Sequence, residues 1–289
     1  MNFVKMHGLG NDFVVIEDFS LSLKNIDRLA RELCERNFGV GADGLVLLHP
    51  SEKAQFRMRI INADGSEAEM CGNALRCVGK YLYEKGLTRE TAISVEMFNT
   101  VKTLRLEVSG NKVASVEVDM GEPILESDLV PVVGARRRVV NEEILAAGES
   151  FLITAVSIGN PHCVIFCDDT SAVPLDVWGP ALEAHEMFPK KTNVEFVEVV
   201  SPEKARFRVW ERGVGQTLAC GSGACAVLVV GVITSRLSRK AILCLPGGEL
   251  TIHWRENNRL YMSGPATEVF TGELAVDSEF AQKYLQRGE

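Results

Sequence analysis

The sequence has no apolar run long enough to cross a membrane. Its longest apolar run, residues 225–233, is interrupted by Gly231, whereas a membrane-spanning helix needs about 20 apolar residues. The N-terminal residues Met1–His7 contain neither an apolar signal core nor a small-residue cleavage site. From these absences we expect a cytoplasmic protein.

Basic residues are few relative to acidic ones. The sequence has 31 lysines and arginines against 39 aspartates and glutamates, which gives a net charge of −8. Its one basic run, Arg136–Arg138, is short enough to be a solvated loop. This charge balance argues against a protein that binds nucleic acids through their phosphates.

The eight cysteines include no Cys-x-x-Cys pair. Cys163 and Cys167 are separated by three residues within an apolar segment, which argues against a structural zinc site and against a thioredoxin-like redox motif. We expect no metal. The long chain without a secretory signal favours reduced thiols over a disulfide framework.

One glycine-rich motif is set aside. Residues 39–44 match G-x-G-x-x-G, but they follow a predicted helix and precede the apolar segment 45–48. A dinucleotide-binding fingerprint follows a strand and opens a helix. The order is reversed here, so we expect no nucleotide cofactor.

A long internal repeat is the main positive feature of the sequence. At an offset of 149 residues, the pair Gly10-Asn11 aligns with Gly159-Asn160, and Cys71-Gly72 aligns with Cys220-Gly221. Arg59 and Arg208 also align. Three matches at one offset predict a duplicated chain, and 289 residues are enough for two medium domains.

Hydrophobic patterning predicts the same elements in both halves, in an α/β (α+β) fold. The expected strands cover residues 13–16, 45–48, 55–60 and 112–119 in the first half, and 163–166, 205–209 and 250–254 in the second. An amphipathic helix is predicted over 25–36, and buried helices start at Cys71 and Cys220. We place the crossover near Gly121. One predicted domain comprises residues 1–120 with 266–289, and the other comprises residues 121–265.

Cys71 and Cys220 carry the chemical interpretation. A cysteine at a helix N-terminus lies beside backbone N–H groups that stabilise a thiolate and bind anions. Two such cysteines at equivalent positions of facing halves are expected to approach one interdomain cleft from opposite sides. A thiolate and a thiol on opposite faces of one carbon can invert its stereochemistry, and the helix N-termini would stabilise the carboxylate of a carbanion without pyridoxal phosphate.

Polar residues accompany both cysteines. Asn62 and Glu211 each lie nine positions before a cysteine, and Arg212 could bind a second carboxylate. These polar residues and His162 also have ordinary structural interpretations. Asparagines occur in turns, His162 could be a buried core histidine, and Glu211-Arg212 could be a solvated pair.

Several segments together resemble the diaminopimelate epimerase family, from about residue 3 to about residue 273. They are Lys5–Phe13, Asn62–Ser66, Met70–Asn73, Gly159–His162, Thr192–Phe196, Glu211–Gly213 and Ala219–Ala224. The resemblance implies interconversion of LL- and meso-2,6-diaminopimelate for lysine and peptidoglycan synthesis. It also implies a homodimer, no cofactor, and two domains that each wrap a β-barrel-like sheet around a central helix.

The resemblance also implies roles for individual residues. Cys71 and Cys220 are the expected acid/base pair, and His162 and Glu211 adjust the pKa of the thiols. Expected substrate-binding residues are Gly72, Asn73, Gly221 and Ser222 at the reacting carboxylate, and Asn11, Asn62, Asn160, Asn193, Glu211 and Arg212 elsewhere on the substrate, mainly at its distal end. Many family members have Gln where this chain has Gly44, so part of that distal contact must come from another residue.

Three alternatives remain at this stage. A proline or hydroxyproline racemase typically has His after the first Cys-Gly, where this chain has Asn73. A non-catalytic binding protein of the same fold is expected to have lost one or both cysteines. A thiol oxidoreductase would use Cys71 and Cys220 as a redox pair.

Overall fold

The computed structural model describes residues 1–68 and 70–286, and one strand arrangement occurs in it twice. Strand β2 (Asn11–Glu17) runs parallel to β3 (Gly44–His49), with Phe13 opposite Gly44. Strand β10 (Pro161–Phe166) runs parallel to β11 (Asn193–Ser201), with His162 opposite Asn193. Each residue of the second pair lies 149 positions after its counterpart, so the duplication predicted from the sequence is confirmed at the level of strand register.

The repeat continues through the next two elements. Strand β4 (Phe56–Asn62) is antiparallel to β3, and β12 (Lys204–Glu211) is antiparallel to β11. Helix α2 (Gly72–Glu84) then follows in the first half and α4 (Gly221–Ile233) in the second. Both helices have bounds that differ by the same 149 residues.

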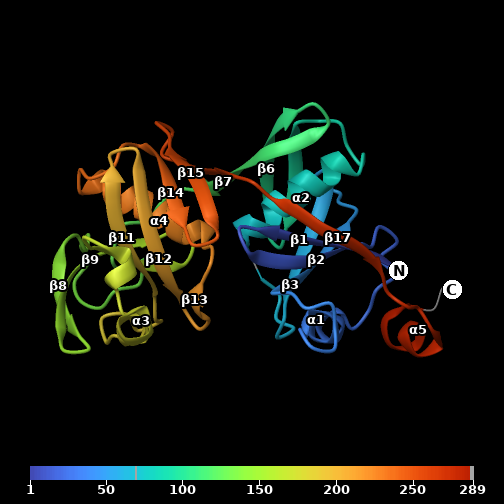
Figure 1. The fold of residues 1–289 in the computed structure, drawn as a ribbon, viewed down its shortest axis with the longest axis horizontal. Coiled ribbons are helices and arrows are strands. Elements are labelled where there is room, and N and C mark those ends of the chain that lie inside the picture. The colour runs from blue at the N-terminus through green and yellow to red at the C-terminus, as the bar shows by residue number, and fades with distance from the viewer. Residues whose placement is uncertain (69, 287–289) are drawn as a thin grey trace. The chain divides into compact units, whose positions relative to one another are not determined.

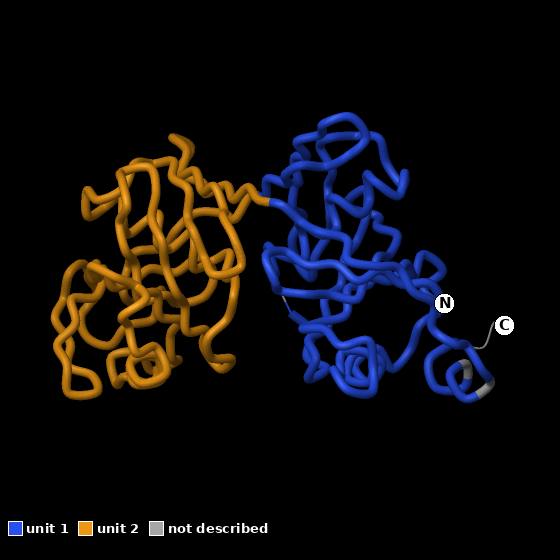
Figure 2. The backbone as a smooth tube through the Cα atoms, viewed as in Figure 1, with its two compact units in different colours: residues 1–118, 265–289 blue, residues 119–264 orange. Residues whose placement is uncertain are grey.

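These elements belong to two units, Met1–Val118 with Pro265–Glu289 and Asp119–Gly264 (Figure 2). In the first unit, β1 pairs antiparallel with both β2 and β17, so the C-terminal strand lies beside the N-terminal one (Figure 1). Strand β5 runs parallel to β4 and begins an antiparallel series through β6 to β7. The remaining bounds are β1 Asn2–Gly8, β5 Ala92–Met97, β6 Thr100–Ser109, β7 Lys112–Gly121, β17 Thr267–Glu273 and α5 Ser278–Tyr284.

The second unit repeats this plan with its own strands. Strand β9 pairs with β8 and β10, and β12 runs parallel to β14, which leads through β15 to β16. The short strand β13 pairs with the end of β12. The bounds are β8 Glu142–Ala146, β9 Glu149–Ser157, η1 Thr170–Ala172, α3 Leu175–Glu183, β13 Gly215–Thr217, β14 Lys240–Leu245, β15 Gly248–Trp254 and β16 Leu260–Gly264.

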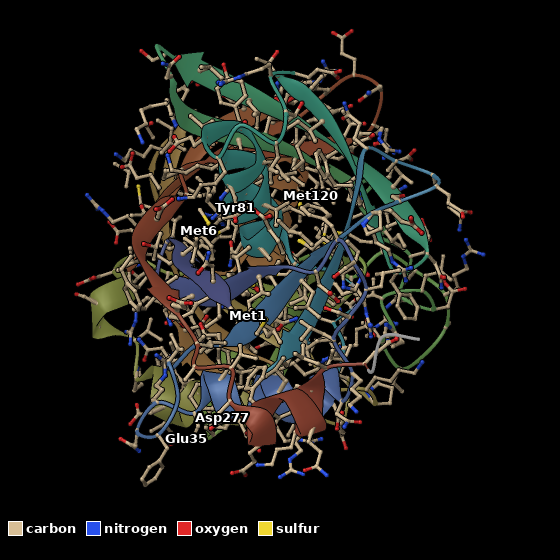
Figure 3. All side chains as sticks on the ribbon, turned by 90° about the vertical axis from the view of Figure 1, so that its right-hand side faces the viewer. Met1, Met6, Glu35, Tyr81, Met120 and Asp277 are labelled. Carbon is tan, nitrogen blue, oxygen red and sulfur yellow. The ribbon has the colours of Figure 1, made fainter. Side chains whose placement is uncertain are left out.

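Each unit encloses one helix within its strands. In α4 every residue from 223 to 231 is buried, and the helix contacts β9, β10, β11, β14 and β15. Small residues allow this close packing: an added Cβ at Gly231 would lie 2.5 Å from Leu237. Helix α2 is enclosed in the same way, and its buried Tyr81 and the buried Met6 of β1 are labelled in Figure 3. The predicted central helices are confirmed.

Helix α1 is shorter than the sequence pattern predicts. It covers Ile26–Cys34, whereas the pattern predicts residues 25–36. Glu35, labelled in Figure 3, has extended backbone angles, and its carboxylate accepts hydrogen bonds from the backbone N–H groups of Asn37 and Phe38. A side chain that binds the next backbone groups competes with the helical hydrogen bonds, so the helix ends early. Within the described residues, no helix is both long and apolar enough for a membrane span.

Removal of a buried side chain from α4 should lower the stability of the second unit. Leu228 is completely buried, so Leu228→Ala should reduce the free energy of unfolding by about 2–5 kcal/mol, through lost burial and a residual cavity. Urea unfolding followed by circular dichroism measures the change. Leu145→Ala is the matched control because Leu145 is 70% exposed and should shift the transition little. Equal effects of the two substitutions would contradict the enclosed position of α4.

Candidate active site

Cys71 and Cys220 occupy the N-cap positions of α2 and α4. Their backbones are extended, with φ and ψ of −148° and 109° at Cys71 and −132° and 109° at Cys220. The predicted helix starts are therefore confirmed. This conformation places each side chain beside the first turn of its helix, where backbone N–H groups have no partner within the helix.

The two sulfur atoms have different surroundings. Cys220 is 5% exposed, and its Sγ accepts a hydrogen bond from Gly223 N at 3.3 Å. Its Sγ also lies 3.6 Å from Ser222 Oγ. Cys71 is half-buried, and its Sγ lies 3.8 Å from Asn11 Oδ1. The equivalent thiols therefore face different polar partners.

In the first unit, two predicted site residues, Cys71 and Asn73, contact the side chain of Asn11. Its Oδ1 accepts hydrogen bonds from Asn73 Nδ2 at 3.0 Å and from the thiol of Cys71. Its Nδ2 donates to Asp43 Oδ2 at 2.8 Å. Gly72 lies between Cys71 and Asn73 as the first residue of α2. Asn11, Cys71 and Asn73 thus form one hydrogen-bonded group, held by Asp43.

Asn62 and Gly44 lie opposite each other at the ends of β4 and β3. Asn62 donates from Nδ2 to Ser66 Oγ at 2.9 Å in the turn that follows β4. An added Cβ at Gly44 would lie 3.1 Å from the carbonyl oxygen of Ile61 and 3.5 Å from the ring of Phe13. Local packing thus leaves little room for a side chain at position 44.

In the second unit, the ring of His162 lies between two side chains, that of Glu195 and that of the predicted site residue Asn160. Both ring nitrogens are engaged: Nδ1 lies 2.6 Å from Glu195 Oε1, and Nε2 lies 2.9 Å from Asn160 Oδ1. The side chains of His162 and Glu195 are completely buried. Their position follows from the parallel pairing of β10 with β11, which places the two strands side by side.

Asn193 joins the end of β11 to the loop that carries Arg212. Its Nδ2 donates to Pro161 O at 2.7 Å, and its Oδ1 accepts from Arg212 N at 2.9 Å. Glu183 accepts from the next backbone amide, Gly213 N, at 3.0 Å. The Arg212 backbone is therefore fixed, while its guanidinium is exposed and donates to Lys190 O.

Glu211 supplies a second carboxylate near Cys220. It is half-buried and accepts a hydrogen bond from Thr217 Oγ1. Burial raises the pKa of Glu211 above its usual value. Burial also raises the pKa of the Cys220 thiol well above its usual value, and the negative charges of Glu211 and Glu195 add to that effect. Cys220 therefore carries its proton at neutral pH in this state.

Glu195, Asp43 and Glu183 were missed as functional candidates by sequence reasoning. Glu195 carried one available signal, because it is a charged residue within the otherwise apolar segment 194–197. Asp43 and Glu183 carried none, since each acts through a partner distant in sequence. No group of three or more His, Cys, Asp or Glu side chains in the described part of the chain is placed to hold a metal ion.

Comparison with known proteins decides the family. The model of the family described as diaminopimelate epimerase matches residues 3–126 and 154–269. The chain belongs to the diaminopimelate epimerase family. It is 50% identical over 277 residues to the diaminopimelate epimerase of Methanococcus maripaludis (strain C6), covering 96% of this chain and 100% of that one. It is 52% identical over 275 residues to the diaminopimelate epimerase of Pelotomaculum thermopropionicum, covering 94% and 98%.

Solved structures share the family's fold at low sequence identity. A PhzF-family phenazine biosynthesis protein of Bacillus anthracis matches with a TM-score of 0.67 and 16% identity, over 96% of this chain and 99% of that one. A hydroxyproline epimerase of Agrobacterium vitis, with bound trans-4-hydroxy-L-proline, matches with a TM-score of 0.68 and 13% identity, over 94% and 91%. The fold is therefore shared with proteins of low sequence identity.

The charge of Glu211 should control the ionisation of Cys220. Because this carboxylate raises the pKa of the thiol, Glu211→Gln should lower that pKa and shift alkylation of Cys220 by iodoacetamide to lower pH. Peptide mass spectrometry resolves the rate for each cysteine. Cys244 is the internal control because its raised pKa arises from burial and from Glu249. An unchanged pH profile for Cys220 would contradict a contribution of the Glu211 charge to its pKa.

Proposed function

We propose that this protein epimerises 2,6-diaminopimelate between its LL and meso forms, with Cys71 and Cys220 as the acid/base pair. The observation that carries the proposal is the occurrence of a cysteine at the N-cap of the enclosed helix in both duplicated units. The relatives that are about half identical over nearly the whole chain are named diaminopimelate epimerases, which supports the choice of substrate.

The reaction needs one thiolate and one thiol. The thiolate removes the α-proton from one face of the carbon, and the thiol donates a proton to the opposite face, so the carbon inverts and the two sulfurs exchange protonation states. The raised pKa of Cys220 makes it the thiol of the state described here. For Cys71 to act as the thiolate, it must first lose the proton that its thiol donates to Asn11 Oδ1. The reverse reaction uses the same residues with their roles exchanged.

The carbanion must be stabilised by the protein's own dipoles. As the α-proton leaves, negative charge develops on the α-carboxylate, and backbone N–H groups at Gly72, Asn73, Gly221 and Ser222 are proposed to bind it. A single well-placed donor of this kind contributes about 3 kcal/mol to the transition state. General acid–base transfer by the thiols contributes roughly another 10²–10⁴-fold in rate.

The remaining polar residues are proposed to select the substrate. Arg212 presents an exposed guanidinium on a loop fixed by Asn193 and Glu183, which suits a second carboxylate. Asn11, Asn62 and Asn160 are proposed to contact the distal amino-acid end, and Glu211 both to contact substrate and to adjust Cys220. His162 is proposed to adjust the thiols through its neighbours.

Domain bounds, oligomeric state and metabolic role are proposed as well. We assign residues 1–120 with 266–289 to one epimerase domain and residues 121–265 to the other, with the substrate handled by both. The enzyme is proposed to work as a cytoplasmic homodimer that needs no cofactor. Its product would serve lysine and peptidoglycan synthesis.

Solvent isotope exchange tests the substrate directly. The reduced protein in deuterium oxide should incorporate deuterium at the α-carbon of diaminopimelate, because the protonating thiol exchanges with solvent. Mass spectrometry of the recovered amino acid detects the label. Incorporation into proline with none into diaminopimelate would assign the protein to the racemases instead.

Serine substitutions test the two thiols. Cys71→Ser and Cys220→Ser should each reduce kcat for epimerisation by roughly 10²–10⁴-fold, because a hydroxyl is a far weaker acid than a thiol. Cys244→Ser serves as the control, since this half-buried thiol on β14 has no role in the proposal. If either site variant retained normal kcat while the protein was folded, the two-thiol mechanism would be wrong.

A further inference from the structure

The duplicated units differ in residue type at three equivalent positions. At the 149-residue offset, the first unit has apolar or small residues where the second has a polar pair and a glycine: Phe13 and His162, Val46 and Glu195, Ala74 and Gly223. Phe13, Val46 and Ala74 are all buried. The framework therefore packs an apolar set at these positions, and the fold by itself does not require a buried histidine and glutamate.

Glu195 is costly to bury. Its side chain is completely buried, and Oε2 has no hydrogen-bond partner among the residues that the structure describes. Its other oxygen, Oε1, lies 2.6 Å from His162 Nδ1. A buried carboxylate with one unsatisfied oxygen destabilises a fold unless it is paired. Its presence in place of a valine thus points to a role in the reaction.

The hydrogen on the His162 ring determines the direction of the hydrogen bonds that link Glu195, His162 and Asn160. Asn160 Oδ1 can only accept, so the 2.9 Å contact requires a hydrogen on His162 Nε2. The contact between Nδ1 and Glu195 Oε1 then shares one proton between an imidazole and a carboxylate. In either form, Glu195 holds the ring and the ring holds Asn160 Oδ1. The amide Nδ2 of Asn160, a donor, remains for a carboxylate of the substrate.

Gly223 connects this pair to the cysteine. An added Cβ at Gly223 would lie 2.9 Å from Glu195 Oε1 and 3.2 Å from Cys220 Sγ. The carboxylate and the sulfur therefore both contact the space left by the missing side chain. The first unit has Ala74 at this position together with the uncharged Val46. The glutamate and the glycine thus form a matched set around Cys220.

We propose that Glu195 is a positioning residue of the Cys220 half of the site, which holds His162 and, through it, the Asn160 side chain in the orientation that binds substrate. This role rests on the proposed function for its effect on catalysis. The negative charge that Glu195 places near Cys220 also contributes to the raised pKa of that thiol. None of these contacts involves a residue outside the second unit.

Two substitutions at Glu195 separate positioning from charge. In Glu195→Gln the amide can donate to Nδ1, so the ring still donates from Nε2 to Asn160, and KM for diaminopimelate should stay within about twofold of the wild type. Glu195→Val removes the partner of Nδ1 and should raise KM by about tenfold or more, with a smaller change in kcat, because loss of one partner of a buried hydrogen bond is worth that much. Equal damage from both variants would overturn a positioning role.

A second readout needs no substrate. NMR shifts of the ring nitrogens, with labelled histidine and the signal assigned by its loss in His162→Phe, report whether Nδ1 has a hydrogen-bond partner. It should have one in the wild type and in Glu195→Gln, and none in Glu195→Val. Unchanged shifts in Glu195→Val would also overturn the proposal. If the wild type does not turn over diaminopimelate, the proposed function fails, and these shifts alone decide the role of Glu195.

The double variant His162→Phe with Glu195→Val guards against misfolding. It carries the pair that the first unit already packs at the equivalent positions, so it should unfold cooperatively like the wild type while keeping the raised KM of Glu195→Val. A folded double variant with wild-type KM would contradict the proposed hydrogen-bond chain.

Discussion

The structure depends on one constraint: in each unit, the helix that begins with a cysteine is enclosed by strands. Because α4 is buried from residue 223 to residue 231, the polar groups at its start are where it can meet a charged molecule. The N-cap residue is at that point, and in both units it is a cysteine with extended backbone angles. Burial of the helix and placement of the sulfur are therefore consequences of the same packing.

Duplication makes the two backbones alike while leaving their side chains independent. The strand register of β2 with β3 recurs in β10 with β11, yet Phe13 and Val46 are replaced by His162 and Glu195. The second unit thus surrounds its thiol with ionisable groups. In the proposed reaction one sulfur holds a proton while the other does not, and the two sulfurs exchange these states at each turnover.

Much of this could be predicted from the sequence because its strongest signals are local. Gly-Asn turns and Cys-Gly helix starts recur at one offset, and they located the strands and both helix starts. The predicted end of α1 was wrong because the Glu35 side chain accepts a hydrogen bond from the backbone that follows, which interrupts the helical pattern. Glu195 was missed as a site residue because its role depends on pairing with His162 across two strands 33 residues apart, which periodicity along one strand does not reveal.

The most direct test of the central claim compares deuterium exchange in Cys71→Ala and Cys220→Ala, each starting from LL- and from meso-diaminopimelate. Each variant keeps a single thiol, which can remove and return the α-proton on one face only. The account predicts that each variant labels one isomer and not the other, that the two variants differ in which isomer they label, and that neither epimerises. Labelling of both isomers by one single-thiol variant would contradict it.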